Sequence, residues 1–371
     1  MAKYDRNNPF NEIPRLPTPA EVEDDPEILK KLVKSSRALA TVNANVLRLP
    51  NPDMLINTIS LQEAKASTAI ENIFTTEDEL YKAISDTARK DKSDPATKEV
   101  LRYREALWGG YQQLEEQQLI NLNLITKIFQ QIKDTRAGLR PPQSMVVIRR
   151  GDSELKPAEV IYTPPRGEDI VERLMENLIE YLNDDSKYTT DPLLKMCIAH
   201  YQFEAIHPFQ DGNGRTGRIL NLLYLVHKKL LSRPVLYLSK YIILNKDEYY
   251  YNLAAVTQRT SWKSWILYML EAVENTAQIT NDLIDQIVNQ MEITLTHGRK
   301  LIKWYNKDVN EALFSQPYSR PKILGDVLNK TSRTTLTKYM DELVNAKILT
   351  PKREGKEMYY LNDDLIRILE K

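Results

Sequence analysis

The sequence has little cysteine, few histidines and no excess of charge. Its single cysteine, Cys197, excludes an intramolecular disulfide framework, and its apolar neighbours indicate that it packs rather than reacts. The four histidines and this cysteine are widely scattered, so no zinc-site spacing occurs. Acidic and basic side chains balance at 51 each. The whole chain therefore has no overall attraction to nucleic acid or to an anionic membrane.

Long apolar runs and glycine are also scarce. The first 19 residues contain no apolar segment, so we expect no secretory signal. No stretch approaches the ~20 apolar residues of a membrane helix, so we expect no membrane partner. Only 11 glycines accompany long segments with apolar residues at helical spacing. We expect a mainly α, cytoplasmic protein whose 371 residues form two or three domains.

One segment, residues 207–218, concentrates chemistry. Glycine at 212 and 214 frees the backbone for positive φ, which Asn213 also tolerates. The residues that follow, up to His227, are apolar almost all round, which is typical of a buried helix. We therefore expect Gly214 to open a buried helix whose free N–H groups and positive dipole end can seat a phosphate.

The side chains of this segment suit a nucleotide. Arg215 and Arg218 are one turn apart, so both can face an anion, and guanidinium groups grip phosphate oxygens in pairs. Asp211 supplies a carboxylate of the kind that holds Mg²⁺ beside substrate phosphates. His207 is the group here suited to taking a proton near neutral pH.

The segment resembles the Fic motif, His-x-Phe-x-Asp/Glu-Gly-Asn-Gly-Arg-x-x-Arg, at every defined position. The resemblance implies a Fic-type helical core with a β-hairpin flap, and transfer of AMP from ATP to a Ser, Thr or Tyr hydroxyl of a protein, which could be the protein itself. It implies that His207 deprotonates the hydroxyl and that Asp211 binds Mg²⁺. The nucleotide-binding residues it implies are Gly212, Asn213, Gly214, Arg215, Thr216, Gly217 and Arg218, with Asn213 and the adjacent backbone cradling the α- and β-phosphates.

A second segment, residues 67–72, suggests control of this site. Ser67 and Glu71 are four residues apart and so share a helix face. In Fic relatives a Ser/Thr-x-x-x-Glu-Gly/Asn helix blocks the site, so the resemblance implies an inhibitory element made by Ser67, Glu71 and Asn72. Glu71 would form a bidentate pair with Arg218 and hold ATP in an unreactive pose. The alternative is an ordinary surface glutamate near a helix end.

Helical spacing predicts most of the remaining chain. We expect helices at 20–49, 53–72, 75–88, 98–118, 121–133, 170–183, 191–206, 247–256 and from 262 toward 290, with the pattern persisting to 305. Residues 234–239 are expected to be a connector. In the helix expected at 247–256, the resemblance favours Tyr250 for stacking on adenine. The alternative is that Tyr250 only packs in the core.

Residues 134–165 have a different character. Prolines and glycines flank two β-prone runs, Met145–Ile148 and Val160–Tyr162, which predict a hairpin. The resemblance implies that this hairpin is a flap over the site, where a target protein segment docks as an added strand. A purely structural hairpin is the alternative.

The end of the chain predicts a small α/β winged-helix module. Apolar positions indicate short helices over 323–328 and 336–344, followed by strands at 348–351 and 358–361. Residues 315–371 contain 11 Lys and Arg against 8 Asp and Glu, a mild excess for DNA binding. Protein contact or a homodimer is therefore favoured over DNA.

These patterns divide the chain into four parts and leave two other functions open. The parts are an N-terminal helical region with the inhibitory helix (1–115), a catalytic core with its flap (116–290 and 134–165), a linker helix (291–314) and the winged-helix domain (315–371). One alternative function is removal of AMP from a modified protein, because Glu71 could orient water. The other is a DNA-binding regulator whose nucleotide site senses a ligand.

Overall fold

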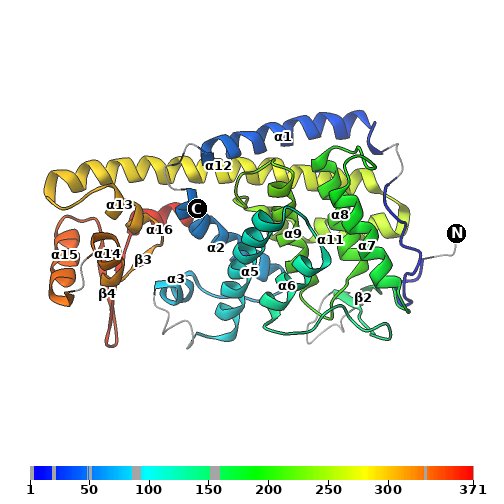
Figure 1. Cartoon of the computed structure of the whole chain (residues 1–371), viewed down its shortest axis with the longest axis horizontal. Coiled ribbons are helices and arrows are strands. Elements are labelled where there is room, and N and C mark those ends of the chain that lie inside the picture. Colours follow the sequence, from blue (N-terminus) through cyan, green and yellow to red (C-terminus); the bar gives the residue numbers. More distant parts are fainter. Residues whose placement is uncertain are drawn as a thin grey trace.

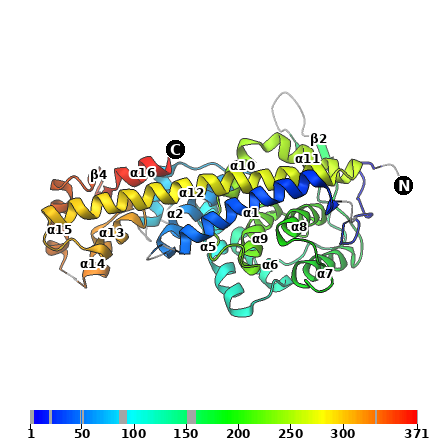
Figure 2. The same ribbon diagram turned by 90° about the horizontal axis from the view of Figure 1, so that it is seen from above.

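The computed structural model describes residues 4–18, 22–47, 49, 52–85, 93–150, 159–329 and 332–370. These segments are mainly helical and are arranged along one long helix, α12 (Trp262–Leu301), whose 40 residues correspond to ~60 Å. Helix α1 (Pro26–Leu47) packs lengthwise on α12 (Figures 1 and 2). A buried hydrogen bond from Ser35 Oγ to the Leu270 carbonyl (2.8 Å) joins the two helices.

The main helical core packs against α12. It consists of α2 (Pro52–Ile70), α5 (Pro95–Gln117), α6 (Leu122–Lys133), α7 (Ile170–Asn183), α8 (Pro192–Ile206), α9 (Asn213–His227), α10 (Leu238–Leu244) and α11 (Lys246–Arg259). At its centre, α8 is buried from Leu193 to Ile206 and α9 from Arg215 to Val226, as the apolar pattern predicted. No helix within the described segments is both long and apolar enough to cross a bilayer.

Capping residues explain where several helices begin. Asp94 accepts a hydrogen bond from Thr97 N (3.0 Å), so α5 starts at Pro95, three residues before the predicted position. Asp191 caps α8 in the same way (2.8 Å to Leu193 N). Within this core α10 was not predicted; it begins at Leu238, inside the connector expected at 234–239.

Two short strands form an antiparallel hairpin beside the core. β1 (Ile148–Arg150) pairs with β2 (Glu159–Tyr162), with Ile148 opposite Tyr162, Arg149 opposite Val160, and a bulge between these pairs. The first strand was predicted at 145–148 but begins at Ile148, and Met145 is 82% exposed. The predicted polar loop, residues 151–158, lies outside the described residues.

The N-terminal arm, residues 4–18, lies along β2 and the segment that follows it. The Tyr4 hydroxyl donates to the Ile161 carbonyl (3.1 Å), and Phe10 N donates to the Thr163 carbonyl (3.0 Å). The rings of Tyr4 and Phe10 meet edge to face. These contacts attach the arm to β2, and Tyr4 also lines the cavity described below.

The C-terminal module packs around a core of its own. Its elements are α13 (Lys307–Phe314), β3 (Tyr318–Ser319), α14 (Pro321–Leu328), α15 (Arg333–Asn345), β4 (Thr350–Glu354), β5 (Glu357–Leu361) and α16 (Asp363–Leu369). The three strands form an antiparallel sheet in the order β3-β5-β4. Leu324, Met340 and Leu343 are fully buried in this second core. Elements α13, β3 and α16 add to the helices and strands that the sequence predicted.

A short helix, α3 (Glu77–Ser85), lies between α2 and this module (Figure 1). Its Asp78 accepts hydrogen bonds from the Tyr318 hydroxyl and from Lys352 Nζ, both at 2.6 Å. Its Lys82, only 4% exposed, pairs with Asp78 (2.5 Å) and with Glu354. The segment after α2 is thus attached to strands β3 and β4.

Candidate active site

The turn between α8 and α9 is fixed by its own residues. Gly212 adopts φ 80°, a conformation that costs a side-chain-bearing residue energy, and α9 begins directly after it at Asn213, one residue earlier than predicted. The Asn213 side chain makes two hydrogen bonds to the backbone of Phe209. Phe209 N donates to Asn213 Oδ1 (2.8 Å), and Asn213 Nδ2 donates to the Phe209 carbonyl (2.9 Å). Thr216 Oγ1 donates to the Gly212 carbonyl (2.9 Å). These bonds fix the position of the first N–H groups of α9, which have no hydrogen-bond partner within the helix.

His207 closes α8 in a left-handed conformation, with φ 51° and ψ 61°. Its ring Nδ1 lies 3.3 Å from the Glu204 carbonyl oxygen, so a hydrogen on Nδ1 can be donated there and Nε2 is left as the basic nitrogen. Burial lowers the pKa of His207 to about 4, against the opposing effect of the Glu204 hydrogen bond, so the ring is neutral at pH 7. The imidazole is half-buried and lines a cavity rather than being enclosed in the core.

Arg140, which the sequence did not single out, holds this turn in place. Its Nε donates to the His207 carbonyl (2.7 Å), and its Nη2 donates to the carbonyls of Pro165 (2.6 Å) and Ile206 (3.2 Å). Its own N–H donates to the Pro208 carbonyl (2.9 Å). One buried guanidinium thus joins the His207 turn to the end of the hairpin segment.

Arg218 is buried and engages the end of α2. Its Nε donates to Ser67 Oγ (2.8 Å), and its Nη2 donates to the Ser67 carbonyl (2.9 Å) and to Glu71 Oε1 (2.8 Å). Glu71 contributes one carboxylate oxygen, so the contact is not the bidentate pair that we expected. Burial raises the pKa of Glu71, but the charge and hydrogen bond of Arg218, with the charges of Arg215 and Lys246, together outweigh burial and the net shift is downward. Glu71 is therefore an anion at neutral pH.

The position of the Glu71 carboxylate is informative. A Cβ added to Gly214 would overlap Glu71 Oε1 and would lie 2.9 Å from Arg218 Nη1. The carboxylate therefore sits on the first turn of α9, where N–H groups and the helix dipole favour an anion. Asn72, the third residue of the predicted element, takes φ 61° after the helix ends at Ile70, and its side chain accepts from Lys246 (3.2 Å).

Asp211 and Arg215 form a separate polar cluster. Lys133 Nζ lies 2.6 Å from Asp211 Oδ2 and 3.5 Å from Glu99 Oε1. Arg215 pairs with Glu99 and lies 3.6 Å from Asp211 Oδ1. The structure thus brings Arg218, and not Arg215, against Glu71. Glu99 and Lys133 come from α5 and α6, and no local pattern in the sequence identified them.

A narrow cavity of about 100 Å³ lies at the His207 turn and the start of α9. Its lining includes His207, Gly214, Arg218, Glu71 and the half-buried Tyr250 of α11. Apolar side chains from the hairpin and α11 also line it, namely Ile148, Ile161, Leu253 and Ala254. Gly212, Asn213, Thr216 and Gly217 hold the turn and α9 rather than lining the cavity.

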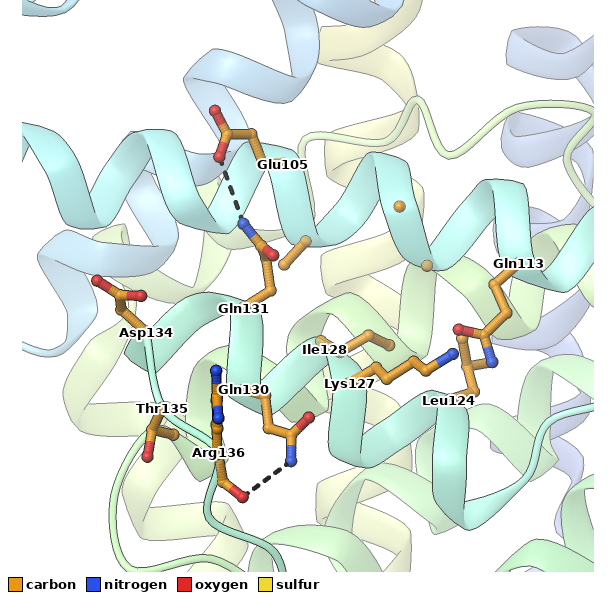
Figure 3. A pocket seen from close by; sticks show the side chains of 13 residues that line it. Glu105, Gln113, Leu124, Lys127, Ile128, Gln130, Gln131, Asp134, Thr135 and Arg136 are labelled. Carbon is orange, nitrogen blue, oxygen red and sulfur yellow. Dashed lines mark hydrogen bonds between the residues drawn. The ribbon is translucent and has the colours of Figure 1, made fainter. Parts of the chain in front are cut away.

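A larger hollow of about 580 Å³ lies between α5 and α6, and Figure 3 shows its lining. None of the residues 207–218 lines it. Its polar groups bond one another, as with Gln131 and Glu105 (3.4 Å), or the backbone, as with Gln130 and the Ala137 carbonyl (3.0 Å). The hollow contains Arg136 and Lys127 but no histidine and no helix N-terminus like that of α9, so we assign the chemistry to the smaller cavity.

Comparison with known proteins identifies the family. Three family models match successive parts of the chain: the Fic/DOC family N-terminal model over residues 29–112, the Fic/DOC family model over 113–225, and the protein adenylyltransferase SoFic-like C-terminal domain over 290–365. The chain belongs to the Fic family. The Fic resemblance that the motif predicted is thereby confirmed.

Individual relatives are similar over part of their length. Protein adenylyltransferase fic-1 of Caenorhabditis elegans is 46% identical over 59 residues, which is 16% of this chain and 11% of the relative. A probable protein adenylyltransferase of Aquifex aeolicus is 29% identical over 180 residues, 47% of this chain and 53% of the relative. Protein adenylyltransferase Fic of Drosophila melanogaster is 26% identical over 195 residues, 51% of this chain and 38% of the relative. The chain thus matches between about a tenth and about half of the length of these relatives.

Solved structures agree on the fold. A Fic family protein from Desulfovibrio desulfuricans G20 superposes with a TM-score of 0.57 at 22% identity, covering 91% of this chain and 96% of that chain. A fragment of Fic-1 from Caenorhabditis elegans gives a TM-score of 0.52 at 20% identity, covering 69% of this chain and 72% of that one. The mainly helical Fic-type fold class predicted from the sequence is confirmed.

Proposed function

We propose that this Fic protein is a protein adenylyltransferase that moves AMP from ATP to a Ser, Thr or Tyr hydroxyl. The observation that carries the proposal is that one cavity holds the basic Nε2 side of His207, the first turn of α9 and Arg218. A neutral imidazole, a helix N-terminus and a buried guanidinium are the groups that a phosphate-transfer step needs. The similar proteins named protein adenylyltransferases support the same reaction.

The reaction follows from the roles of these groups. His207 Nε2 removes the proton of the target hydroxyl as its oxygen bonds the α-phosphorus of ATP. The bond from the α-phosphorus to the bridging oxygen breaks, and pyrophosphate leaves. The N–H groups at the start of α9 stabilise the negative charge that develops on the α-phosphate oxygens. Because little covalent work falls to the protein, positioning supplies most of the acceleration.

Asp211 fits a supporting role toward Mg²⁺. It is the carboxylate of the motif nearest the start of α9, and its side chain is 65% exposed. Its partner Lys133 has a flexible side chain, so a divalent cation can take its place. The described residues contain no group of three or more His, Cys, Asp or Glu side chains able to hold a metal by themselves. A Mg²⁺ ion held by one carboxylate and by substrate phosphates is the arrangement that such a site suits. The ion would neutralise phosphate charge there.

We infer that Glu71 keeps the site inactive. Its carboxylate occupies the anion seat and Arg218 at once, and the cavity that remains, about 100 Å³, is far smaller than the ~300–1,000 Å³ of ligand pockets. A triphosphate competes for the same N–H groups and the same guanidinium. Displacement of Glu71 is therefore required before ATP can lie in a reactive pose.

The hairpin is proposed as the docking edge for the target protein. Within the described residues β1 pairs only with β2, while carbonyls of β2 and the segment after it already accept bonds from Tyr4 and Phe10. The open edge is therefore that of β1, where an extended target segment can add as a strand. Main-chain bonds of this kind would place a hydroxyl beside His207.

We further propose that the C-terminal module is a winged helix that contacts protein. The order α13-β3-α14-α15-β4-β5 and the sheet order β3-β5-β4 support this assignment. Arg333 and Lys338 on α15 supply little positive charge for phosphate contacts, which disfavours DNA. A single buried free thiol, Cys197, suits a reducing cytoplasm.

The central test follows transfer of label from ATP labelled at its α-phosphate to protein. We expect His207→Ala to lower labelling at least ~100-fold with the fold unchanged, because loss of a general base costs about that much. The matched control, His227→Ala at the half-buried end of α9, should retain labelling. Retained labelling in His207→Ala would remove the imidazole from its role. Faster loss of AMP from a labelled target than its addition would instead favour the reverse activity.

A further inference from the structure

One buried acid of the cavity has no role in the chemistry described so far. Glu204 lies on α8 one turn before His207, is 6% exposed, and lines the cavity. Its Oε1 is buried and has no hydrogen-bond partner among the described residues. Buried polar atoms in proteins are nearly always paired, so an unpaired carboxyl oxygen on a residue that lines the cavity indicates a missing partner.

Four tyrosine hydroxyls around the cavity are different, because each already has a hydrogen-bond partner. The Tyr162 hydroxyl donates to the Ala205 carbonyl (2.8 Å), and the Tyr4 hydroxyl donates to the Ile161 carbonyl (3.1 Å). Two further hydroxyls of the lining bond elsewhere: Tyr201 to Thr257 (2.9 Å) and Tyr249 to His200 (2.9 Å). Unlike these hydroxyls, Glu204 retains hydrogen-bonding capacity for a ligand.

Glu204 lies beside the expected phosphate seat. Gly214 and Arg218, against which phosphates would lie, line the same cavity as Glu204. A Cβ on Gly217 would come within 2.6 Å of Glu204 Oε1, so the carboxyl rests beside α9. The apolar side chains of Ile161 and Leu253 also line the cavity and suit a base. In a nucleotide the sugar is the group that follows the phosphates and carries the base.

The charge state of Glu204 fits a sugar next to phosphates. Burial raises the pKa of Glu204 to about 8, while Arg218 opposes the rise and Glu71 adds to it. The other titratable groups that face this region are Tyr249 and Tyr250 of α11, whose pKa values burial also raises. At pH 7 Glu204 is thus an uncharged acid, which both donates and accepts hydrogen bonds as a ribose hydroxyl does, and it does not repel a triphosphate.

We propose that Glu204 hydrogen-bonds a ribose hydroxyl of the bound nucleotide and makes the site selective for ribonucleotides over deoxynucleotides. The proposal rests on the nucleotide site described under the proposed function. It assigns Glu204 a contact with substrate that is separate from the proton transfer of His207 and from the phosphate contacts of Arg218.

The test measures dissociation constants of ATP, 2′-deoxyATP and 3′-deoxyATP by titration calorimetry with Mg²⁺. All variants carry Glu71→Gly so that the site is open. We expect the Glu71→Gly protein to bind ATP at least tenfold more tightly than one of the two deoxynucleotides. Adding Glu204→Ala should weaken ATP about tenfold and leave that deoxynucleotide unchanged, so that the preference disappears. Adding Glu176→Ala, an exposed change on α7, should leave the preference intact.

The isosteric change Glu204→Gln provides a second readout if the alanine variant does not fold. As the pH rises the acid ionises and repels the triphosphate, so the ATP affinity of the Glu71→Gly protein should fall, and adding Glu204→Gln should remove this fall. An unchanged ATP preference in folded Glu204→Ala, or an identical pH profile in Glu204→Gln, would overturn the proposal. If the Glu71→Gly protein binds none of the three nucleotides, the proposed function fails as well.

Discussion

Replacing Glu71 by glycine should change activity and stability in opposite directions. Glu71 holds Arg218 through one oxygen at 2.8 Å, and its side chain is 31% exposed. Removing one partner of a fully buried pair costs ~3–5 kcal/mol. Because solvent reaches this carboxylate, we expect about 2 kcal/mol instead. We take the same value of about 2 kcal/mol as the free energy by which the closed site, with Glu71 on Arg218, is favoured over the open one. It corresponds to ~30-fold in the equilibrium between the closed and the open site.

Two assays therefore check one number. The rate of α-phosphate label transfer should rise about 30-fold in Glu71→Gly, and the free energy of unfolding in urea should fall by about 2 kcal/mol. Glu71→Gln keeps the size of the side chain and one hydrogen-bond acceptor but removes the charge. Its rate of label transfer and its free energy of unfolding should therefore lie between those of the parent and of Glu71→Gly. Glu116→Gly, at the exposed end of α5, controls for glycine near a helix end. A lower unfolding free energy with an unchanged rate would show that Glu71 is structural only.

Three further predictions concern neighbouring features. Gly214→Ala should lower label transfer at least tenfold, opposite to Glu71→Gly, because its new methyl group crowds the phosphate seat itself. Burial lowers the pKa of His200 to about 3, so below pH ~6.5 the unfolded chain takes up a proton at this residue that the folded chain does not. In urea titrations from pH 6 to 4, stability should fall less steeply in His200→Gln than in the parent, by ~1.4 kcal/mol per pH unit. Lys82→Met should lower the unfolding free energy by about 1–3 kcal/mol, since it leaves carboxylate partners without their cation, whereas exposed Lys300→Met should have no effect.

The sequence could predict what lies in contiguous or periodic segments. The turn of residues 207–218 needs its glycines and its asparagine at fixed spacing, so the local pattern identified both the turn and the buried helix after it. The pairing of Glu71 with Arg218, which the family resemblance implied, is present in the structure. It joins groups 147 residues apart, and helical spacing alone indicated only that Ser67 and Glu71 share a face.

What remained hidden depends on tertiary contacts. Arg140 and Glu99 act on the motif from segments whose own sequence shows no motif, so only the fold brings them there. Glu204 is one turn before His207 and could have been noticed from that spacing, but its missing partner is visible only once its burial is known. Arg215 was expected to face the same anion as Arg218, yet Glu99 and Asp211 take it into a separate cluster.

Helix α3 connects the C-terminal module to the segment that carries Glu71. The stretch that starts with Ser67 is tied to Arg218 at its beginning and to the β3–β4 strands through Asp78 and Lys82 at its end. Asp78 and Lys82 lie seven and eleven residues beyond Glu71. A displacement of strands β3 and β4 would therefore act on the segment that carries Glu71 without any contact to the nucleotide site.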